Sequence, residues 1–411
     1  MKTSKKHIVL VTTWFPPRNS VAVNRMWAFA KYFDKTFFDV DVITLQVDSA
    51  LMEEQLTNGV FVYRLPNRML FRKATFNKSV PYVIHKLKAF YNVVLYTFFK
   101  NEYADWQKRA ERKLMELLTL YDNDTTVISS YEPMAPHLAV LSLKQKGVAF
   151  HWVADCRDEM ANNPSLISSL KKAYTKIEQA ILLNADILST VSKPILDNFL
   201  ATVGNKYLIG AEIRNGFDFE FEEKLLHNEI FTVVSAGTFY GKRKPYVFFT
   251  ALERFLLQNP TKKVRLKLIG AGNSVIVPSS LFHVVETLPK VSHEGAIAQM
   301  RQADCLLLIL PKVVQKGVYS GKLFEYLGCK RPILATVDKT DVAADLIQEC
   351  NAGFVADFDD VQEIEQCIEQ AYTLWERKES LPMNDELIMW HHRKNQVKIL
   401  NDLIINSFYT K

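Results

Sequence analysis

Short apolar runs recur along the first half of the chain and are separated by segments of helical periodicity. The runs at residues 7–13, 38–45, 126–130 and 148–154 are rich in apolar and β-branched residues. Strands of a parallel sheet are buried on both faces and have this continuous pattern. A strand followed by a helix and another strand predicts a right-handed crossover, so the first half is expected to form a doubly wound parallel sheet.

The same alternation restarts at residues 230–236 and continues to the end of the chain. Between the two halves, Arg214-Asn215-Gly216 predicts a turn into a linker that ends near residue 228. A chain of 411 residues is too long for one hydrophobic core. We therefore expect an α/β protein with a first domain at 1–216 and a second domain at 229–384, followed by a terminal helix at 385–411.

One stretch of the second half, residues 317–332, has the clearest chemistry. It follows the apolar run at 305–310, and Ser320 is placed to cap a helix that starts at Gly321 and ends at Gly328. The helix N-terminus and Lys322 would then lie at the carboxyl edge of the sheet, where phosphates bind. Glu325, one turn later, could accept hydrogen bonds from sugar hydroxyls. An ordinary surface helix with an i,i+3 ion pair is the alternative.

Other strand ends carry glycines or charges. Residues 237–244 hold two glycines and three adjacent cations, which suits a pyrophosphate, although a solvated basic turn has the same composition. A Gly-Ala-Gly turn begins at Gly270. In the first half, Asp155, Arg157 and Asp158 follow a strand and are a candidate site, with a salt-bridged turn as the alternative.

Composition adds four expectations. The chain is 48% hydrophobic and 23% charged, as in soluble globular proteins. Its five scattered cysteines predict reduced thiols in a cytoplasmic protein, and they have no spacing typical of a metal site. Neither a signal peptide nor a membrane span is expected. No dinucleotide fingerprint and no nucleic-acid-binding module is recognisable.

Residues 67–101 differ from the rest of the chain, because they contain seven basic and eight aromatic residues and no acid. Such a segment suits peripheral contact with an anionic membrane surface or a lipid-phosphate acceptor. A pair of helices whose aromatic rings pack into the domain is an equal alternative.

Taken together, these motifs resemble those of GT-B-fold glycosyltransferases of the large family-4 type, in the bacterial surface-polysaccharide branch. The matching segments occur in the family's order and cover nearly the whole chain: 14–17 with Arg25, 129–138, 152–158, 185–192, 215–216, 237–244, 268–272, 303–304 and 320–326. The resemblance implies two Rossmann-like domains that face each other across a cleft, with the terminal helix returning to the first domain.

The resemblance also assigns roles to residues. It implies that the second domain binds a nucleoside-diphosphate sugar through Gly237, Arg243, Lys244, Gly270, Ser320, Gly321 and Lys322, with Glu325 on the ribose. It implies that the first domain binds the acceptor near Pro17, Arg18 and Arg25, and that Asp155, Arg157 and Asp158 orient the acceptor or handle its proton. No metal and no cofactor is expected, because fixed cations would stabilise the leaving diphosphate.

The predicted activity is transfer of a sugar, from a UDP-sugar, to a glycan or polyprenyl-linked acceptor in capsule or O-antigen synthesis, with retention of configuration. The protein would be cytoplasmic, on the inner face of the membrane. Two departures stand out: Gly317 lies eight positions before Glu325, where many relatives have a glutamate, and Ser20-Val21 replaces a glycine pair. The alternatives are a sugar-nucleotide 2-epimerase, for which Asp155, Asp158, His137 and His293 would be the acid/base candidates, and a non-catalytic partner subunit.

Overall fold

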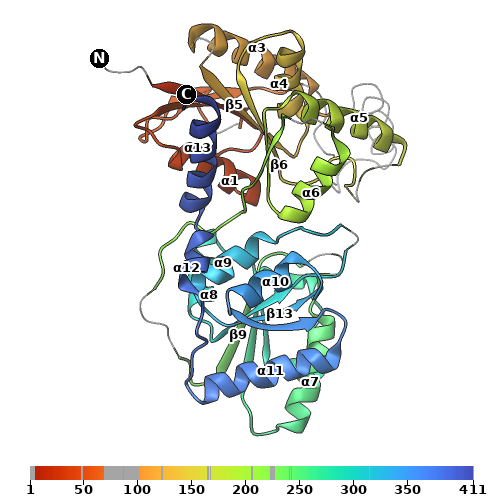
Figure 1. Ribbon diagram of the computed structural model, residues 1–411. Coiled ribbons are helices and arrows are strands. Elements are labelled where there is room, and N and C mark those ends of the chain that lie inside the picture. Colours follow the sequence, from red (N-terminus) through yellow and green to blue (C-terminus); the bar gives the residue numbers. More distant parts are fainter. Residues whose placement is uncertain are drawn as a thin grey trace. The chain divides into compact units, whose positions relative to one another are not determined.

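The computed structural model describes residues 5–47, 50–68, 87, 101–121, 124–163, 166, 168–204, 207–222, 227–239, 241, 243–313 and 315–410. The chain forms two compact units, Met1–Ile213 with Val397–Lys411, and Arg214–Gln396 (Figure 1). Residues 385–396, expected with the first domain, belong to the second unit. Nearly all of the segment 67–101, for which membrane contact is predicted, lies outside the described residues. Within the described ranges, no helix has both the length and the apolar character needed to cross a membrane.

The first unit is built on an eight-stranded sheet with the order β3-β4-β2-β1-β5-β6-β7-β8. Its neighbouring strands are parallel except β3 and β4. The strands are β1 (Lys6–Val11), β2 (Phe38–Leu45), β3 (Glu53–Gln55), β4 (Phe61–Leu65), β5 (Thr125–Tyr131), β6 (His151–Cys156), β7 (Ile187–Thr190) and β8 (Ile209–Glu212). The helices are α1 (Val21–Tyr32), α3 (Ala104–Tyr121), α4 (Ala135–Gln145), α5 (Ser168–Asn184), α6 (Lys193–Thr202) and the later part of α13 (Arg393–Phe408).

Helix α1 shows how the sequence builds this unit. As predicted, Ser20 caps the helix, and its hydroxyl accepts a hydrogen bond from the Val23 N–H at 3.2 Å. Met26 and Phe29 are buried on one face of the helix and pack in a single core with Leu10 of β1 and Leu400 of α13. The end of the chain therefore completes the core of the first unit.

The second unit has a six-stranded, all-parallel sheet with the order β11-β10-β9-β12-β13-β14. The strands are β9 (Phe231–Ala236), β10 (Val264–Ile269), β11 (Val285–Leu288), β12 (Cys305–Ile309), β13 (Ile333–Val337) and β14 (Gly353–Asp357). The helices are α7 (Tyr246–Gln258), α8 (His293–Arg301), α9 (Gly321–Cys329), α10 (Val342–Glu349), α11 (Val361–Glu376), α12 (Asp385–Trp390) and the start of α13.

Alternate strand residues of this sheet enter two separate cores. Leu306 and Leu308 of β12 pack with α8, α9 and α10, whereas Cys305 and Leu307 pack with α7 and α11. Figure 1 shows helices on both sides of the β9 and β13 strands. The prediction of an α/β protein with two Rossmann-like parallel sheets is confirmed, although α3, α10, β3 and β8 were not anticipated.

The predicted end of α9 was wrong by one residue, and Gly328 has a different role. The helix continues to Cys329, and Lys330 adopts the left-handed conformation that ends it, with φ 53°. Gly328 is buried, and a Cβ on it would lie 2.6 Å from Cγ of Phe217. The glycine therefore makes room for the Phe217 ring.

A histidine without polar partners is buried in the second unit. His391 follows α12, and its ring lies 5.5 Å from that of Phe324 and 4.9 Å from that of Trp390. Within the described part of the chain, neither of its ring nitrogens has a hydrogen-bond partner. Burial, together with the positive charge of Arg214, lowers the pKa of His391 to about 3. The imidazole is therefore neutral in the folded protein.

We expect His391→Leu to make folding less sensitive to acid. In the unfolded chain a histidine binds a proton near pH 6.5, whereas folded His391 does not, so stability is lost as the pH falls below 6.5. The loss is about 2 kcal/mol at pH 5. Urea unfolding of wild type and variant at pH 7 and pH 5 measures the difference, with exposed His283→Leu as control. An equal loss of stability in wild type and His391→Leu would contradict the prediction.

Candidate functional site

Three loops meet at the carboxyl edge of the second sheet. They follow β9, β10 and β12, which are neighbours in the sheet order. The connection after β9 leads to β10 on one side, and the connection after β12 leads to β13 on the other. The strand order reverses between β9 and β12, and open α/β sheets bind ligands outside such a reversal.

Gly237, at the end of β9, has the backbone conformation and the free space that Lys322 needs. Its φ is +111°, and a Cβ there would lie 2.4 Å from Cε and 2.7 Å from Nζ of Lys322. Gly270 approaches from β10, and a Cβ on it would lie 3.0 Å from the Gly237 carbonyl oxygen. Only glycines at both positions allow this close approach, so the Lys322 side chain lies across the Gly237 backbone.

The Lys322 ammonium lies in an environment that disfavours its positive charge. Burial and the nearby positive charge of Arg243 lower its pKa to about 8, and Glu325 opposes this shift only partly. Nζ is 5.4 Å from the centre of the Phe239 ring. Two cations placed together at the start of a helix form a site that an anion would stabilise.

The N-terminus of α9 adds backbone donors to these cations. Ser320 precedes the helix in an extended conformation, but its hydroxyl makes no capping hydrogen bond, contrary to the prediction. Its carbonyl oxygen instead accepts a hydrogen bond from the Leu323 N–H at 3.1 Å. The Ser320 hydroxyl is thus not used by the helix.

Glu325, one turn into α9, contacts His293, which sequence analysis named only as an acid/base candidate for the epimerase alternative. Nε2 of His293 is 2.9 Å from Oε1 of Glu325. His293 is the first residue of α8, and Ser292 caps that helix by accepting a hydrogen bond from the Gly295 N–H. The spacing of 32 residues gave no sequence signal for this pair.

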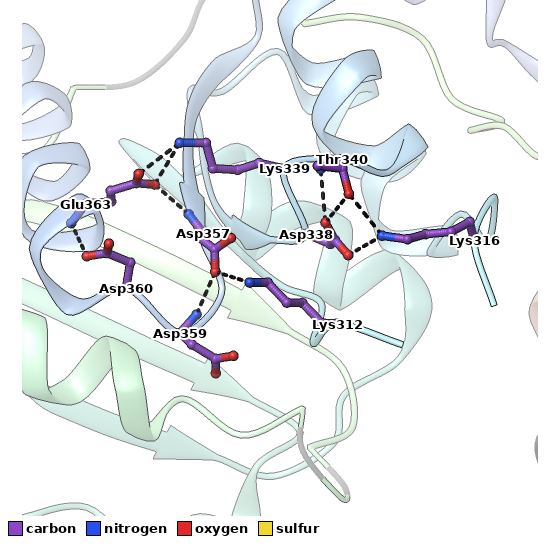
Figure 2. A network of polar contacts seen from close by, with 9 residues as sticks. All are labelled: Lys312, Lys316, Asp338, Lys339, Thr340, Asp357, Asp359, Asp360 and Glu363. Carbon is purple, nitrogen blue, oxygen red and sulfur yellow. Dashed lines mark hydrogen bonds and ion pairs between the residues drawn. The ribbon is translucent and has the colours of Figure 1, made fainter. Parts of the chain in front are cut away.

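The loop between β12 and α9 is held from two neighbouring strand ends (Figure 2). Lys312 pairs with Asp357 at 2.8 Å, and Lys316 contacts Asp338 and, at 3.1 Å, Thr340. The Gly317 N–H donates to Asp341 Oδ1 at 2.8 Å. Gly317 has φ +85°, which favours glycine. A glutamate at this position would therefore require a different loop conformation.

The acidic residues beyond β14 serve the fold. Asp360 accepts hydrogen bonds from the N–H groups of Gln362 and Glu363, both at 2.9 Å, and caps α11. Glu363 binds Lys339 at 2.9 Å (Figure 2). These residues line an open cavity of about 670 Å³. Lys339 and Glu363 pair with each other and Asp360 caps α11, so these three residues have roles in the fold.

The two other predicted donor-side cations lie in the loop between β9 and α7. Arg243 is close enough to Lys322 to lower its pKa. Lys244 lies 5.7 Å from the centre of the Tyr246 ring. The structure therefore brings Gly237, Gly270, Arg243 and Lys322 together and puts Lys244 against an aromatic ring.

In the first unit, Asp155 is completely buried at the end of β6. Arg25 contacts it at 2.6 Å, and the hydroxyls of Ser130 and Ser189 donate to it, each at 2.8 Å. Arg25 also donates to the Ile213 carbonyl at 2.8 Å. Burial alone would raise the pKa of Asp155, but the Arg25 charge and these hydrogen bonds hold it below its usual value. Asp155 and Arg25, predicted for catalysis and the acceptor loop, are here a buried structural pair.

Arg157 and Asp158 lie just beyond β6 and are only partly buried. Nε of Arg157 donates to the Tyr131 carbonyl at 2.5 Å. Burial raises the pKa of Asp158, and the charge of Arg157 opposes this. A carboxyl whose pKa is raised holds a proton more readily than an exposed one.

The opening loop after β1 is held to the turn after β5. Nε1 of Trp14 donates to the Glu132 carbonyl at 2.7 Å. Arg18 donates to the Thr13 carbonyl at 3.4 Å and stacks 5.3 Å from the Trp14 ring centre. Pro17 lies in the same turn. Together these contacts fix Trp14, Pro17 and Arg18 at the carboxyl edge of the first sheet.

His137 is buried against this edge. Its Nδ1 is 2.6 Å from the Ser129 hydroxyl, and its Nε2 is 3.5 Å from Sγ of Cys156. Burial lowers the pKa of His137 to about 4. A neutral, enclosed imidazole of this kind is unsuited to a role as general acid at neutral pH.

Comparison with known proteins finds likeness in structure only. No protein-family model and no curated protein matches the sequence. The chain is similar to a glycosyltransferase from Rickettsia africae ESF-5, with 14% identity, a TM-score of 0.58, and 99% of this chain and 95% of that one covered.

Two further solved structures match to the same extent. One is a UDP-forming α,α-trehalose-phosphate synthase from Burkholderia vietnamiensis, with 12% identity, TM-score 0.59 and coverage of 98% and 99%. The other is the N-terminal domain of trehalose-6-phosphate phosphatase from Candida albicans, with 12% identity, TM-score 0.64 and coverage of 99% and 98%. At such identities the likeness concerns the fold, and the predicted GT-B fold, with its two Rossmann-like units, is confirmed.

Proposed function

We propose that this protein is a glycosyltransferase that moves a sugar from a nucleoside-diphosphate sugar, a UDP-sugar, to an acceptor hydroxyl. Its second unit would bind the donor. Lys322, Arg243 and the N-terminus of α9 would hold the diphosphate, and Glu325 would bind the ribose. The observation that carries this proposal is the Lys322 ammonium beside Arg243, held over Gly237 at the reversal of the sheet order.

The choice of UDP comes from a protein of similar fold and not from the geometry of the diphosphate site. A synthase with the same fold, from Burkholderia vietnamiensis, is described as UDP-forming. The residues around Lys322 recognise charge and do not identify a base. We therefore propose a UDP-sugar as the donor and make the choice of nucleotide part of the test below.

In this reaction the donor site would have to stabilise the departing nucleoside diphosphate. The bond between the sugar's anomeric carbon and the diphosphate oxygen breaks, the acceptor oxygen forms a bond to that carbon, and the acceptor loses its proton. Negative charge grows on the diphosphate, where fixed cations and helix N–H groups act without reorganising. We propose that this takes place without a metal ion and with retention of configuration, as in the glycosyltransferases that the sequence resembles.

The acceptor would be bound by the first unit. Arg157 and Asp158 lie at the carboxyl edge of its sheet, and the raised pKa of Asp158 suits a group that takes up the acceptor's proton. We propose a glycan or polyprenyl-linked acceptor of surface-polysaccharide synthesis, bound near Pro17 and Arg18. The basic and aromatic composition of residues 67–101 supports a place on the cytoplasmic face of a membrane.

Calorimetric titration of nucleoside diphosphates and their sugars, in the presence of a metal chelator, tests the donor site. We expect UDP or a UDP-sugar to bind, and Lys322→Ala to weaken it by about tenfold or more, the value of a charge-assisted hydrogen bond. Lys312→Ala is the matched control, because Lys312 lies in the loop that leads into α9 but pairs with Asp357. Absence of binding by every nucleotide would refute the donor assignment and favour a non-catalytic subunit.

A further inference from the structure

The contact between His293 and Glu325 joins the first residue of α8 to the middle of α9. Nε2 and Oε1 are 2.9 Å apart, and the side chains are 36% and 18% exposed. Both groups therefore reach the surface of the second unit. Because a carboxylate only accepts, Nε2 of His293 must carry the proton of this hydrogen bond.

The two helices do not need this contact in order to pack. Ile297 and Met300 of α8 share a buried core with Leu323 and Leu327 of α9. An exposed ion pair adds little stability to helices already held by such a core. What the contact does is fix one oxygen of Glu325, the residue that would face the ribose.

We propose that His293 is a positioning residue for the nucleoside, which holds Oε1 of Glu325 so that the carboxylate is presented to the ribose 2′- and 3′-hydroxyls. This inference rests on the proposed function. It adds that the charge on His293 sets how strongly the site distinguishes ribose from deoxyribose.

The charged groups around His293 determine when that charge changes. The hydrogen bond to Glu325 raises the pKa of His293, and burial opposes it. The charges of Glu325 and of Glu294 on its own helix also raise it, whereas Arg393 of α13 lowers it. From α9, Lys322 interacts with the same Glu325 carboxylate.

This arrangement gives the ribose contact a defined pH dependence. Below the raised pKa, the imidazolium neutralises Glu325 and weakens it as an acceptor. As the pH rises through that pKa, the imidazole becomes neutral and the carboxylate recovers its full charge. Hydrogen bonds to a charged acceptor are stronger than those to a neutral one. The preference for ribose over deoxyribose should therefore increase with pH.

The test measures dissociation constants of UDP and of 2′-deoxy-UDP between pH 6 and pH 8.5. The ratio of the two constants cancels the diphosphate contacts, including the contact that Lys322 makes with the diphosphate. In the wild type we expect the preference for UDP to grow with pH to about tenfold, the value of one hydrogen bond to a charged acceptor. Glu325→Gln should reduce the preference to about twofold or less at every pH, as expected for a neutral acceptor.

Two variants of His293 separate positioning from folding. His293→Gln keeps a neutral N–H donor, so it should retain the preference for UDP but lose its dependence on pH. His293→Leu should lose most of the preference while still binding 2′-deoxy-UDP as the wild type does. A wild-type ratio that is constant with pH, or one that changes equally in His293→Gln, would overturn the proposal. If neither of these two nucleotides binds at any pH, UDP is not the donor nucleotide, and if no nucleoside diphosphate binds, the proposed function itself fails.

Discussion

Replacing Asp155 by alanine is expected to lower the free energy of unfolding by about 3 to 5 kcal/mol, the usual cost of leaving a buried charge without its partner. The Arg25 and Asp155 side chains are 3% and 0% exposed and lie 2.6 Å apart. Without the carboxylate, the Arg25 guanidinium and the hydroxyls of Ser130 and Ser189 all lose an acceptor. Urea unfolding followed by tryptophan fluorescence measures the change, since Trp152 is buried in the same strand.

Two further variants make the Asp155 result interpretable. Replacing both partners, as in Arg25→Met with Asp155→Leu, should cost much less than Asp155→Ala, because no buried charge remains. Asp39→Ala, which removes an exposed partner of Lys5, should change stability by less than about 1 kcal/mol. If Asp155→Ala folds as stably as the wild type and loses only activity, Asp155 is catalytic after all.

The sheets could be predicted because their signal is local. Runs such as 8–11 and 305–310 are apolar throughout, which is typical of a strand buried on both faces. The position of α9 followed from the apolar run before it, and with it the place of Lys322 at a strand end. Strands and helices could be predicted from the sequence wherever the residues of the element itself determine its structure.

The elements that were missed have a different cause. Helix α3 is rich in charges, and its buried residues Trp106, Ala110, Leu114 and Leu117 recur at helical spacing that was present in the sequence but not used. Strand β8 is four residues long, and its first two residues are exposed. A segment this short has no periodicity, so only its pairing with β7 reveals it.

Side-chain partners distant in sequence were beyond prediction. Asp155 appeared to be a catalytic residue because it follows a strand, but its partner Arg25 is 130 positions away and removes it from solvent. His293 and Asp341 each bind a residue of the donor-side loop or helix, at separations of 32 and 24 residues. Residue type and strand-end position identify candidates, and only packing decides which of them remain accessible.

Replacing Lys322 by alanine is expected to lower kcat by about 10²- to 10³-fold, the typical effect of removing one preorganised group that stabilises developing negative charge. The proposed function gives Lys322 this task at the leaving diphosphate. Steady-state transfer from the donor identified by calorimetry measures it. The control is Lys312→Ala. Because Lys312 pairs with Asp357 in the wild type, this variant should retain wild-type kcat.

The pH dependence of the same reaction tests the charge of Lys322 directly. Its pKa is about 8 in the free protein, so kcat/KM should fall as the pH rises above 8 and the ammonium loses its proton. A bound diphosphate favours the charged form, so the fall in kcat should come at higher pH. Lys322→Arg keeps its charge throughout and should lose the alkaline fall in kcat/KM, although its planar group fits the space over Gly237 less well. An alkaline fall that persists unchanged in Lys322→Arg would assign the titration to another group and remove Lys322 from the mechanism.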